Sequence, residues 1–260
     1  AGSLVAFSAH AGSMSVTGSA SLTFSNADDA SHAAEGNTWS MGDSLTFAGS
    51  GEMDNGMTIS YYQLLSAGAF SSSGLKLDMG DAGMLTFANG TSQGHGIGAY
   101  EDKMPTANEN VWDDLDGQAN GVLTKNATNK IGYGTSFAGA NISVDYNKQQ
   151  DGGSAKSIAV DYAPMDGAMI FIAQSDEYAG TNASTDQVTF GGTYTSGAVT
   201  AGIQRTSIDF STVNTDTDKT HIAASFAVNE DMSVSWGMST VEFENGTLTD
   251  QEDSGFGISY

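Results

Sequence analysis

The chain of 260 residues contains no cysteine, which excludes disulfide scaffolds, thiol catalysis and cysteine-ligated metals. It contains only 2 prolines, so it is not a proline-rich disordered chain. No stretch after the N-terminal region approaches the roughly 18 consecutive apolar residues of a transmembrane helix. This last absence does not argue against membrane-spanning strands, because half of the residues in such a strand are polar.

Basic residues are also scarce, with 8 Lys and Arg against 31 Asp and Glu, for a formal net charge of -23. Nucleic acid and anionic membrane surfaces are therefore poor partners for this chain. Most of the acidic residues lie in the predicted connections rather than in the strands. The excess of acid fits solubility in a salty medium, and it equally fits a pore mouth that attracts cations.

Signatures of catalysis are missing as well. The sequence has no G-x-S-x-G and no H-E-x-x-H motif, and the 4 His residues are scattered. The glycine-rich run from Gly90 to Gly98 is not followed by a predicted helix, so it does not indicate a phosphate site. The sequence predicts no enzyme.

What the chain does have is alternation of polar and apolar residues. From Ser13 to Ser25 every odd position is Ser or Thr, and every even position is apolar or Gly. Successive side chains of a strand point to opposite faces, so this segment has one apolar face and one hydroxyl face. Its length matches that of a tilted strand across a bilayer. The same pattern around a closed sheet gives a barrel that is apolar outside and polar inside.

Similar segments predict about fourteen strands. They lie near 13–25, 42–53, 56–64, 74–79, 84–88, 130–135, 140–147, 156–163, 168–175, 187–195, 198–206, 220–228, 232–243 and 254–260. The connections alternate between long and short, including a long one over 65–73 and a hairpin at Asn55-Gly56. Short turns at one end and long loops at the other are typical of outer-membrane barrels. The predicted fold class is all-β, a transmembrane antiparallel barrel.

The first eleven residues stand apart from this pattern. They form a short apolar run that ends in Ala9-His10-Ala11, an A-x-A cleavage signal. We expect residues 1–11 to be the remnant of a secretory signal peptide and residues 12–260 to be the barrel. A first strand or a plain tail is the alternative.

One connection, residues 89–128, is much longer than the others and has no strand pattern. Loops of this length are usually functional or disordered. Because the length and position of this loop are unusual, we expect it to form a pore constriction, and an externally solvated loop is the alternative. Rings of acids in a pore favour cations. The candidate constriction residues are Glu101, Asp102, Lys103, Glu109, Asp113, Asp114 and Asp116. Tyr100 and Trp112 are candidates to anchor the loop to the wall or to form a small core of its own.

Parity along the strands identifies candidate residues of the lumen wall. Ile158, Val160 and Tyr162 represent the outward faces, and charges at the opposite parity point inward. These inward charges are Glu52, Lys76, Asp78, Lys130, Asp145 and Asp161.

Weak oxygen-ligand candidates for Ca²⁺ are Asp113, Asp114, Asp116, Asp216 and Asp218, but none fits an EF-hand. We expect no other metal and no cofactor.

The segment from Gly74 to Phe87 is similar to the hairpin that enters the third loop of the Gram-negative general porins. The segments Asn129–Tyr133 and Phe137–Tyr146 are similar to the hairpin that leaves it. The chain thus resembles a family of trimeric, sixteen-stranded outer-membrane barrels whose third loop folds into the lumen. The resemblance implies a homotrimer in contact with outer-membrane lipid and lipopolysaccharide. It also implies passive diffusion of small hydrophilic solutes and ions.

Two features depart from the family. Its members end in an aromatic residue, usually Phe, that completes the last strand, whereas this chain ends at Tyr260 within a predicted strand. We therefore expect a fragment with two strands missing, and a closed fourteen-stranded barrel stays open. Many porins also place several arginines opposite the constriction, and this chain has one, Arg205. The alternative to a cation-preferring porin is a secreted all-β surface or adhesin module with acidic, Ca²⁺-binding loops.

Overall fold

The computed structural model describes residues 13–27, 36–90, 95–101, 103–106, 121–123, 129–148, 152–178, 184–211, 216–244 and 248–260. Within these residues, fourteen antiparallel strands form one sheet, in which each strand pairs with its neighbours in the sequence. The strands are β1 (Ser13–Ala27), β2 (Gly36–Glu52), β3 (Thr58–Ser66), β4 (Ala69–Asp78), β5 (Met84–Asn89), β6 (Lys130–Phe137), β7 (Ala140–Lys148), β8 (Ser154–Tyr162), β9 (Ala168–Tyr178), β10 (Ser184–Ser196), β11 (Val199–Phe210), β12 (Thr217–Ala227), β13 (Ser233–Phe243) and β14 (Gln251–Ser259). Two short 3₁₀ helices, η1 (Gly80–Ala82) and η2 (Ile97–Tyr100), interrupt the connections around β5.

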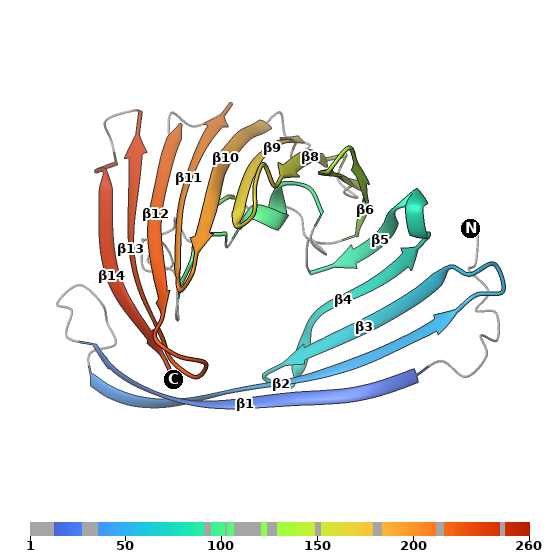
Figure 1. The fold of residues 1–260 in the computed structure, drawn as a ribbon, viewed down its shortest axis with the longest axis horizontal. Coiled ribbons are helices and arrows are strands. Elements are labelled where there is room, and N and C mark those ends of the chain that lie inside the picture. The colour runs from blue at the N-terminus through green and yellow to red at the C-terminus, as the bar shows by residue number, and fades with distance from the viewer. Residues whose placement is uncertain are drawn as a thin grey trace.

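The sheet curls strongly around a central space, from β14 over β9 to β5 and back along β4 to β1 (Figure 1). Within the described ranges, no ladder joins β1 to β14, so the curvature is observed without a closed ring. In the same ranges, no helix has the length and apolar character needed to cross a membrane.

All fourteen predicted strands are present, so the fold-class prediction is confirmed. Most ends are shifted by a few residues, and β2 begins six residues earlier than predicted. The prediction of a long connection over residues 65–73 is wrong. Ala67 and Gly68 alone join β3 to β4, and their φ angles of 49° and 72° are both positive. A two-residue hairpin of this kind matches the twist of its strands. Positive φ at an alanine is uncommon, which is why the sequence did not indicate it.

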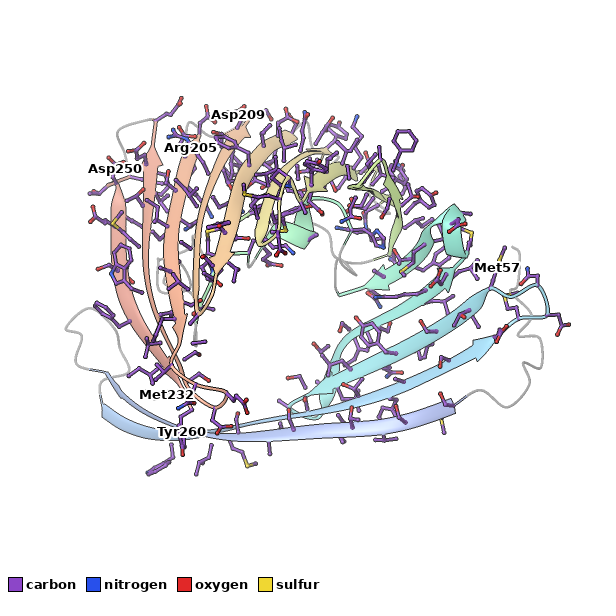
Figure 2. The ribbon with its side chains drawn as sticks, viewed as in Figure 1. Met57, Arg205, Asp209, Met232, Asp250 and Tyr260 are labelled. Carbon is purple, nitrogen blue, oxygen red and sulfur yellow. The ribbon has the colours of Figure 1, made fainter. Side chains whose placement is uncertain are left out.

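The two faces of the sheet have opposite character, and side chains project from both (Figure 2). On the convex face, large apolar side chains are exposed along nearly every strand. Leu45, Phe47, Tyr61, Val144, Tyr146, Ile158, Tyr162, Val188, Phe190, Tyr194 and Trp236 all belong to this set. On the concave face, many of the buried side chains are polar, including Thr189, Gln204, Thr206 and His221. This is the reverse of the pattern in soluble proteins, which rarely expose large contiguous apolar patches.

Charged side chains on the convex face lie toward the long connections. Lys156 pairs with Asp176 at 3.1 Å, and Arg205 pairs with Asp218 at 3.0 Å. Figure 2 places Arg205 and Asp209 at the same rim of the sheet. A Lys or Arg on the lipid face costs about 2–4 kcal/mol at mid-membrane and about 0–1 kcal/mol near the interface. Their position therefore suits a convex face whose middle contacts hydrocarbon.

Candidate functional site: a segment bound to the concave face

Parts of the long connection between β5 and β6 lie on the concave face of the sheet. We call residues 95–101, 103–106 and 121–123 the inner segment. Its first part meets β7 and β8, where Gly96 N donates to Ser143 Oγ and Ile97 N donates to Ser157 Oγ, both at 3.0 Å. Since these strands point hydroxyls inward, the wall supplies acceptors for backbone groups that have no strand partner.

The second group of contacts comes from side chains of β10 and β11. Gln187 pairs with both backbone groups of Leu123, donating to its carbonyl at 2.5 Å and accepting from its N–H at 3.0 Å. Gln204 Nε2 donates to the carbonyl of Tyr100 at 2.8 Å, and Thr206 Oγ1 donates to that of Gly121 at 2.6 Å. Amide and hydroxyl side chains of the wall thus satisfy irregular backbone that would otherwise be buried unpaired.

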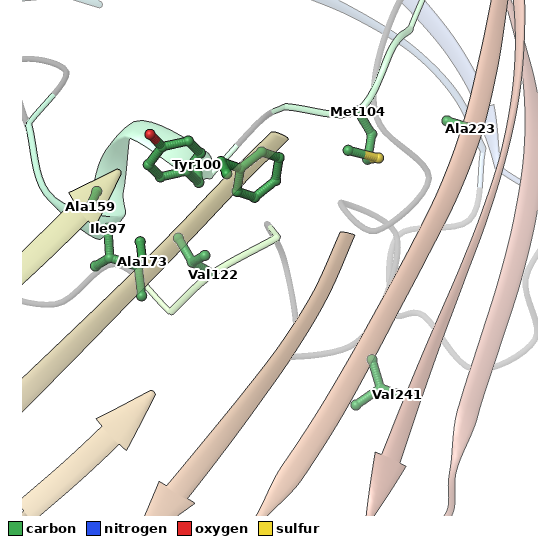
Figure 3. Close-up of a cluster of buried hydrophobic side chains, with 9 residues drawn as sticks. Ile97, Tyr100, Met104, Val122, Ala159, Ala173, Ala223 and Val241 are labelled. Carbon is green, nitrogen blue, oxygen red and sulfur yellow. The ribbon is translucent and has the colours of Figure 1, made fainter. Parts of the chain in front are cut away.

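A small apolar cluster adds to these hydrogen bonds (Figure 3). Tyr100 stacks on Phe171 of β9, with ring centroids 4.5 Å apart and an interplanar angle of 20°. Ile97, Met104 and Val122 of the inner segment belong to the same cluster. The wall contributes the small side chains of Ala159, Ala173 and Ala223 along with Val241. The aromatic anchor predicted at Tyr100 therefore binds the wall, while Trp112 lies outside the described residues.

Glycines mark the places where the inner segment comes closest to the wall. His95 lies over β6, where a Cβ on Gly134 would come within 2.7 Å of His95 Cε1. On β11, a Cβ on Gly202 would come within 3.1 Å of Met104 Sδ. Gly96 has φ of 62°, and a Cβ there would overlap Ser157 Oγ and Asp145 Oδ2. Glycine in a strand permits such close approach of another chain segment.

Lys130 and Asp145, both predicted to face the lumen, form an ion pair of 3.2 Å on the concave face. Their side chains are only 5% and 3% exposed. Instead of facing open channel water, the pair is buried in the region where Gly96 packs. Mutual pairing replaces the hydration that these two charges would have in an open channel.

Replacing Lys130 by Met leaves Asp145 as a buried, unpaired charge. We expect the free energy of unfolding to fall by about 3–5 kcal/mol. The double variant Lys130→Met/Asp145→Leu removes both charges and should recover most of that loss. Urea titrations in lipid vesicles measure all three proteins, and equal losses for the single and double variants would contradict the pairing.

Other predicted site residues have varied positions. Glu101 and Lys103 belong to the inner segment, and Lys103 Nζ lies 5.4 Å from the centre of the Tyr100 ring. Glu52 and Asp78 are exposed, and Lys76 is half-buried. Asp161 accepts hydrogen bonds from the Tyr100 hydroxyl at 2.9 Å and from Asn141 Nδ2 at 2.7 Å. The remaining candidates, Asp102, Glu109, Asp113, Asp114 and Asp116, lie outside the described residues.

Two Ca²⁺ candidates are engaged in other contacts. Asp216 Oδ1 accepts from Phe210 N at 2.9 Å, and Asp218 contacts Arg205 and Ser207. Across the part of the chain that the structure describes, no three His, Asp or Glu residues converge closely enough to hold a metal ion.

Several concave residues were missed by the sequence reasoning. Gln187, Gln204 and Thr206 bind the inner segment, and Lys219 and His221 of β12 are buried on the same face. His221 Nδ1 and Ser239 Oγ share a hydrogen bond of 2.8 Å. Their inward parity was readable from the sequence, but parity alone does not reveal which chain segment, if any, a wall side chain binds.

We expect the attachment of the inner segment to depend on pH through His95. Burial and the nearby Lys76 lower the pKa of His95 from 6.5, against smaller opposing effects of Asp145 and the Tyr133 backbone. A lowered pKa favours the neutral ring in the bound segment, so this contribution is complete above pH 6.5 and declines as the pH falls below it. We expect faster proteolysis of the segment at pH 5 than at pH 7.5. The His95→Gln variant should lose that difference, and a pH effect that persists in it would assign the titration elsewhere.

A cleft of about 720 Å³ opens beside the inner segment. Its lining includes Asp78 and Asp81 near the β4–β5 turn, Asp161 on β8, and His95, Tyr100 and Lys103 from the inner segment. Carboxylates therefore line this cleft on two sides, at the β4–β5 turn and on β8.

No protein-family model and no curated protein sequence matches the chain. Solved structures do match. The anion-selective porin from Comamonas acidovorans has a TM-score of 0.69 at 16% identity, covering 95% of this chain and 84% of its own. The chain has a porin fold. OmpT, an outer membrane protein of Vibrio cholerae, matches with a TM-score of 0.70 at 11% identity, and the match covers 98% of this chain and 84% of the OmpT chain. A triple mutant of the Rhodopseudomonas blastica porin matches with a TM-score of 0.53 at 16% identity, and the match covers 95% of this chain and 99% of the porin chain. At these identities, the porin likeness concerns the fold alone.

Proposed function

We propose that the protein is an outer-membrane porin through which small hydrophilic solutes and ions diffuse passively. The observation that carries this proposal is the reversed distribution of side chains, with exposed apolar residues on the convex face and polar residues on the concave face. A convex face of this kind suits hydrocarbon, and a polar concave face suits a water-filled lumen. The porin fold of the compared structures supports the same assignment.

In this proposal the inner segment narrows the lumen, since it is bound to the concave face by wall side chains. We further propose a homotrimer of sixteen-stranded subunits in contact with outer-membrane lipid and lipopolysaccharide. The mechanism contains no chemical step.

Preference for cations is the electrostatic part of the proposal. The net charge is -23, and the Lys130–Asp145 pair contributes no net charge to the concave face. Exposed Glu52 and Asp78, with Asp161, add negative charge to that face. Carboxylates along a pore raise the local concentration of cations.

A secreted surface or adhesin module is not favoured. In the parts of the chain that are described, all strands belong to one sheet, so no second sheet covers the apolar convex face. A soluble sandwich would bury that face against a partner sheet.

Liposome swelling tests the diffusion proposal. Vesicles that contain the folded protein should swell rapidly in arabinose and much more slowly in raffinose, because the inner segment limits the size of the passing solute. Swelling no faster than that of protein-free vesicles would contradict a pore.

A further inference from the structure

Three methionines lie side by side where β2, β3 and β4 meet the short turns. Met53 directly follows β2, Met57 directly precedes β3, and Met79 directly follows β4. Met53 N donates to Met57 O at 2.7 Å, which continues the β2–β3 ladder by one position. The β3–β4 ladder ends at the pair Thr58–Asp78, so Met57 and Met79 occupy the next opposed positions. We call these three residues, which cross three neighbouring strands, the methionine row.

The methionine row belongs to the convex face of the sheet. Met53 shares the parity of Phe47 on β2, whose side chain is exposed on that face. Met57 and Met79 lie on the same face, because opposed residues of antiparallel strands point to the same side. Side chains opposed in this way have Cβ atoms about 4.5–5.5 Å apart. Since a methionine side chain is unbranched and flexible, the two outer sulfur atoms can reach the sulfur in the middle.

Hydrogen bonds within the turns hold the backbone of the methionine row in place. Asn55 Oδ1 accepts from Met57 N at 3.2 Å, and Gly56 N donates to Met53 O at 2.9 Å. In the β4–β5 turn, Met79 N donates to Gly83 O at 2.9 Å. The protein itself therefore brings the three residues together, and no ligand is needed to assemble them.

Thioether sulfur and the charges around it define the matching ligand. Thioethers are soft donors that suit Cu(I), whereas Ca²⁺ and Mg²⁺ prefer oxygen ligands. The chain has no cysteine, so methionine is its only source of a soft ligand. Exposed carboxylates adjoin the row, since Glu52, Asp54 and Asp78 are each next to Met53 or Met79 in the chain. Negative charge of this kind raises the local concentration of cations.

Contact with lipid does not by itself require methionine at these positions. Immediately further into the sheet, the same face carries Ile59 opposed to Leu77. The change from aliphatic side chains to thioethers therefore coincides with the rim, where the exposed carboxylates lie. A positive charge on this face costs little near the interface and much more at mid-membrane. The rim is thus the part of the convex face where a bound cation is tolerated.

We propose that Met53, Met57 and Met79 form a binding site for one Cu(I) ion, with three thioether ligands. The site lies on the convex face, so it goes beyond the pore and does not depend on whether the lumen conducts.

Titration of the folded chain with Ag(I) in chloride-free detergent solution tests the site. Ag(I) is a soft cation with the same charge as Cu(I), and it prefers sulfur in the same way. Nuclear magnetic resonance of protein labelled with ¹³C in the methionine methyl groups distinguishes the 11 methionines. We expect three methyl signals to move together and to saturate at one ion per chain. Movement spread over most of the signals, or no movement, would overturn the site.

Variants assign the site to the methionine row. The triple variant Met53→Leu/Met57→Leu/Met79→Leu removes all three sulfur atoms and keeps the apolar volume. It should no longer take up Cu(I) from a Cu(I)–bicinchoninate complex, whose absorbance reports the transfer. Met57→Leu alone removes the middle ligand. It should weaken binding by at least about tenfold, because loss of even an outer-shell partner of a metal site costs about 10–100-fold.

The matched control is Met14→Leu/Met41→Leu/Met165→Leu. It also removes three methionines, and these are 82%, 72% and 59% exposed on separate strands or turns. Uptake of Cu(I) should be unchanged in the control. Equal losses in the two triple variants, or full uptake by the variant that lacks the methionine row, would overturn the proposal. Circular dichroism of each variant confirms that the sheet has formed.

Discussion

Replacing Gly96 by Ala should detach the inner segment from the concave face and increase the single-channel conductance. The backbone of Gly96 has φ of 62°, which costs an L-residue about 1–2 kcal/mol. The added Cβ would also overlap Ser157 Oγ and Asp145 Oδ2. Because Asp145 is held by Lys130, the neighbouring wall has little freedom to move away. We expect a total loss of about 3 kcal/mol or more in unfolding free energy.

Gly56 provides the matched control for this variant. Its φ is 82°, and nothing lies within 4 Å of a Cβ placed on it. The Gly56→Ala variant therefore carries the backbone strain without the overlap, and it should lose only about 1–2 kcal/mol. Its conductance should equal that of the unmodified protein. If both variants had the same conductance, the inner segment would not be the element that narrows the pore.

Replacing Tyr100 by Ala should have a comparable effect through a different set of contacts. The side chain is 3% exposed, stacks on Phe171 and donates to Asp161. Burial, and then the Asp161 carboxylate, raise the pKa of Tyr100 above its ordinary 10, so the hydroxyl remains a donor across the usual pH range. Truncating a buried aromatic residue costs about 3–5 kcal/mol. We expect a lower free energy of unfolding in lipid vesicles and a larger, noisier single-channel current.

Tyr100→Phe separates the ring from the hydroxyl. It keeps the stack on Phe171 and removes the hydrogen bond to Asp161, so it should cost about 2 kcal/mol. Its conductance should stay close to that of the unmodified protein. A phenylalanine variant as damaged as the alanine variant would show that the hydroxyl, rather than the stack, holds the inner segment.

The strands were predictable because alternation with period two can be recognised in a short stretch of sequence. A strand shows this alternation whenever one of its faces contacts lipid or a core and the other contacts water. Parity likewise placed Lys130, Asp145 and Asp161 on the concave side. The β3–β4 connection was not predictable, since Ala67 occupies a conformation that alanine rarely adopts. The sequence also indicated that 89–128 is a special loop. It did not indicate how that loop is attached.

The attachment depends on residues far apart in the sequence. Gln187 binds Leu123 across 64 positions, and Gln204 binds Tyr100 across 104. Neither glutamine has a neighbouring motif that announces this role. Gly134 and Gly202, at inward positions of their strands, were the available signal, because glycine in a strand marks close approach. Which segment approaches is decided by the curvature of the sheet, and this is a property of all the strands together.

Single-channel recording in a planar bilayer under a KCl gradient tests the central claim most directly. For the folded chain we predict discrete upward current steps with a reversal potential of the sign set by cation preference. Steps with the opposite sign would retain the pore and contradict the role assigned to the acidic residues. The absence of any steps, from protein whose circular dichroism confirms the β-sheet, would contradict the porin itself.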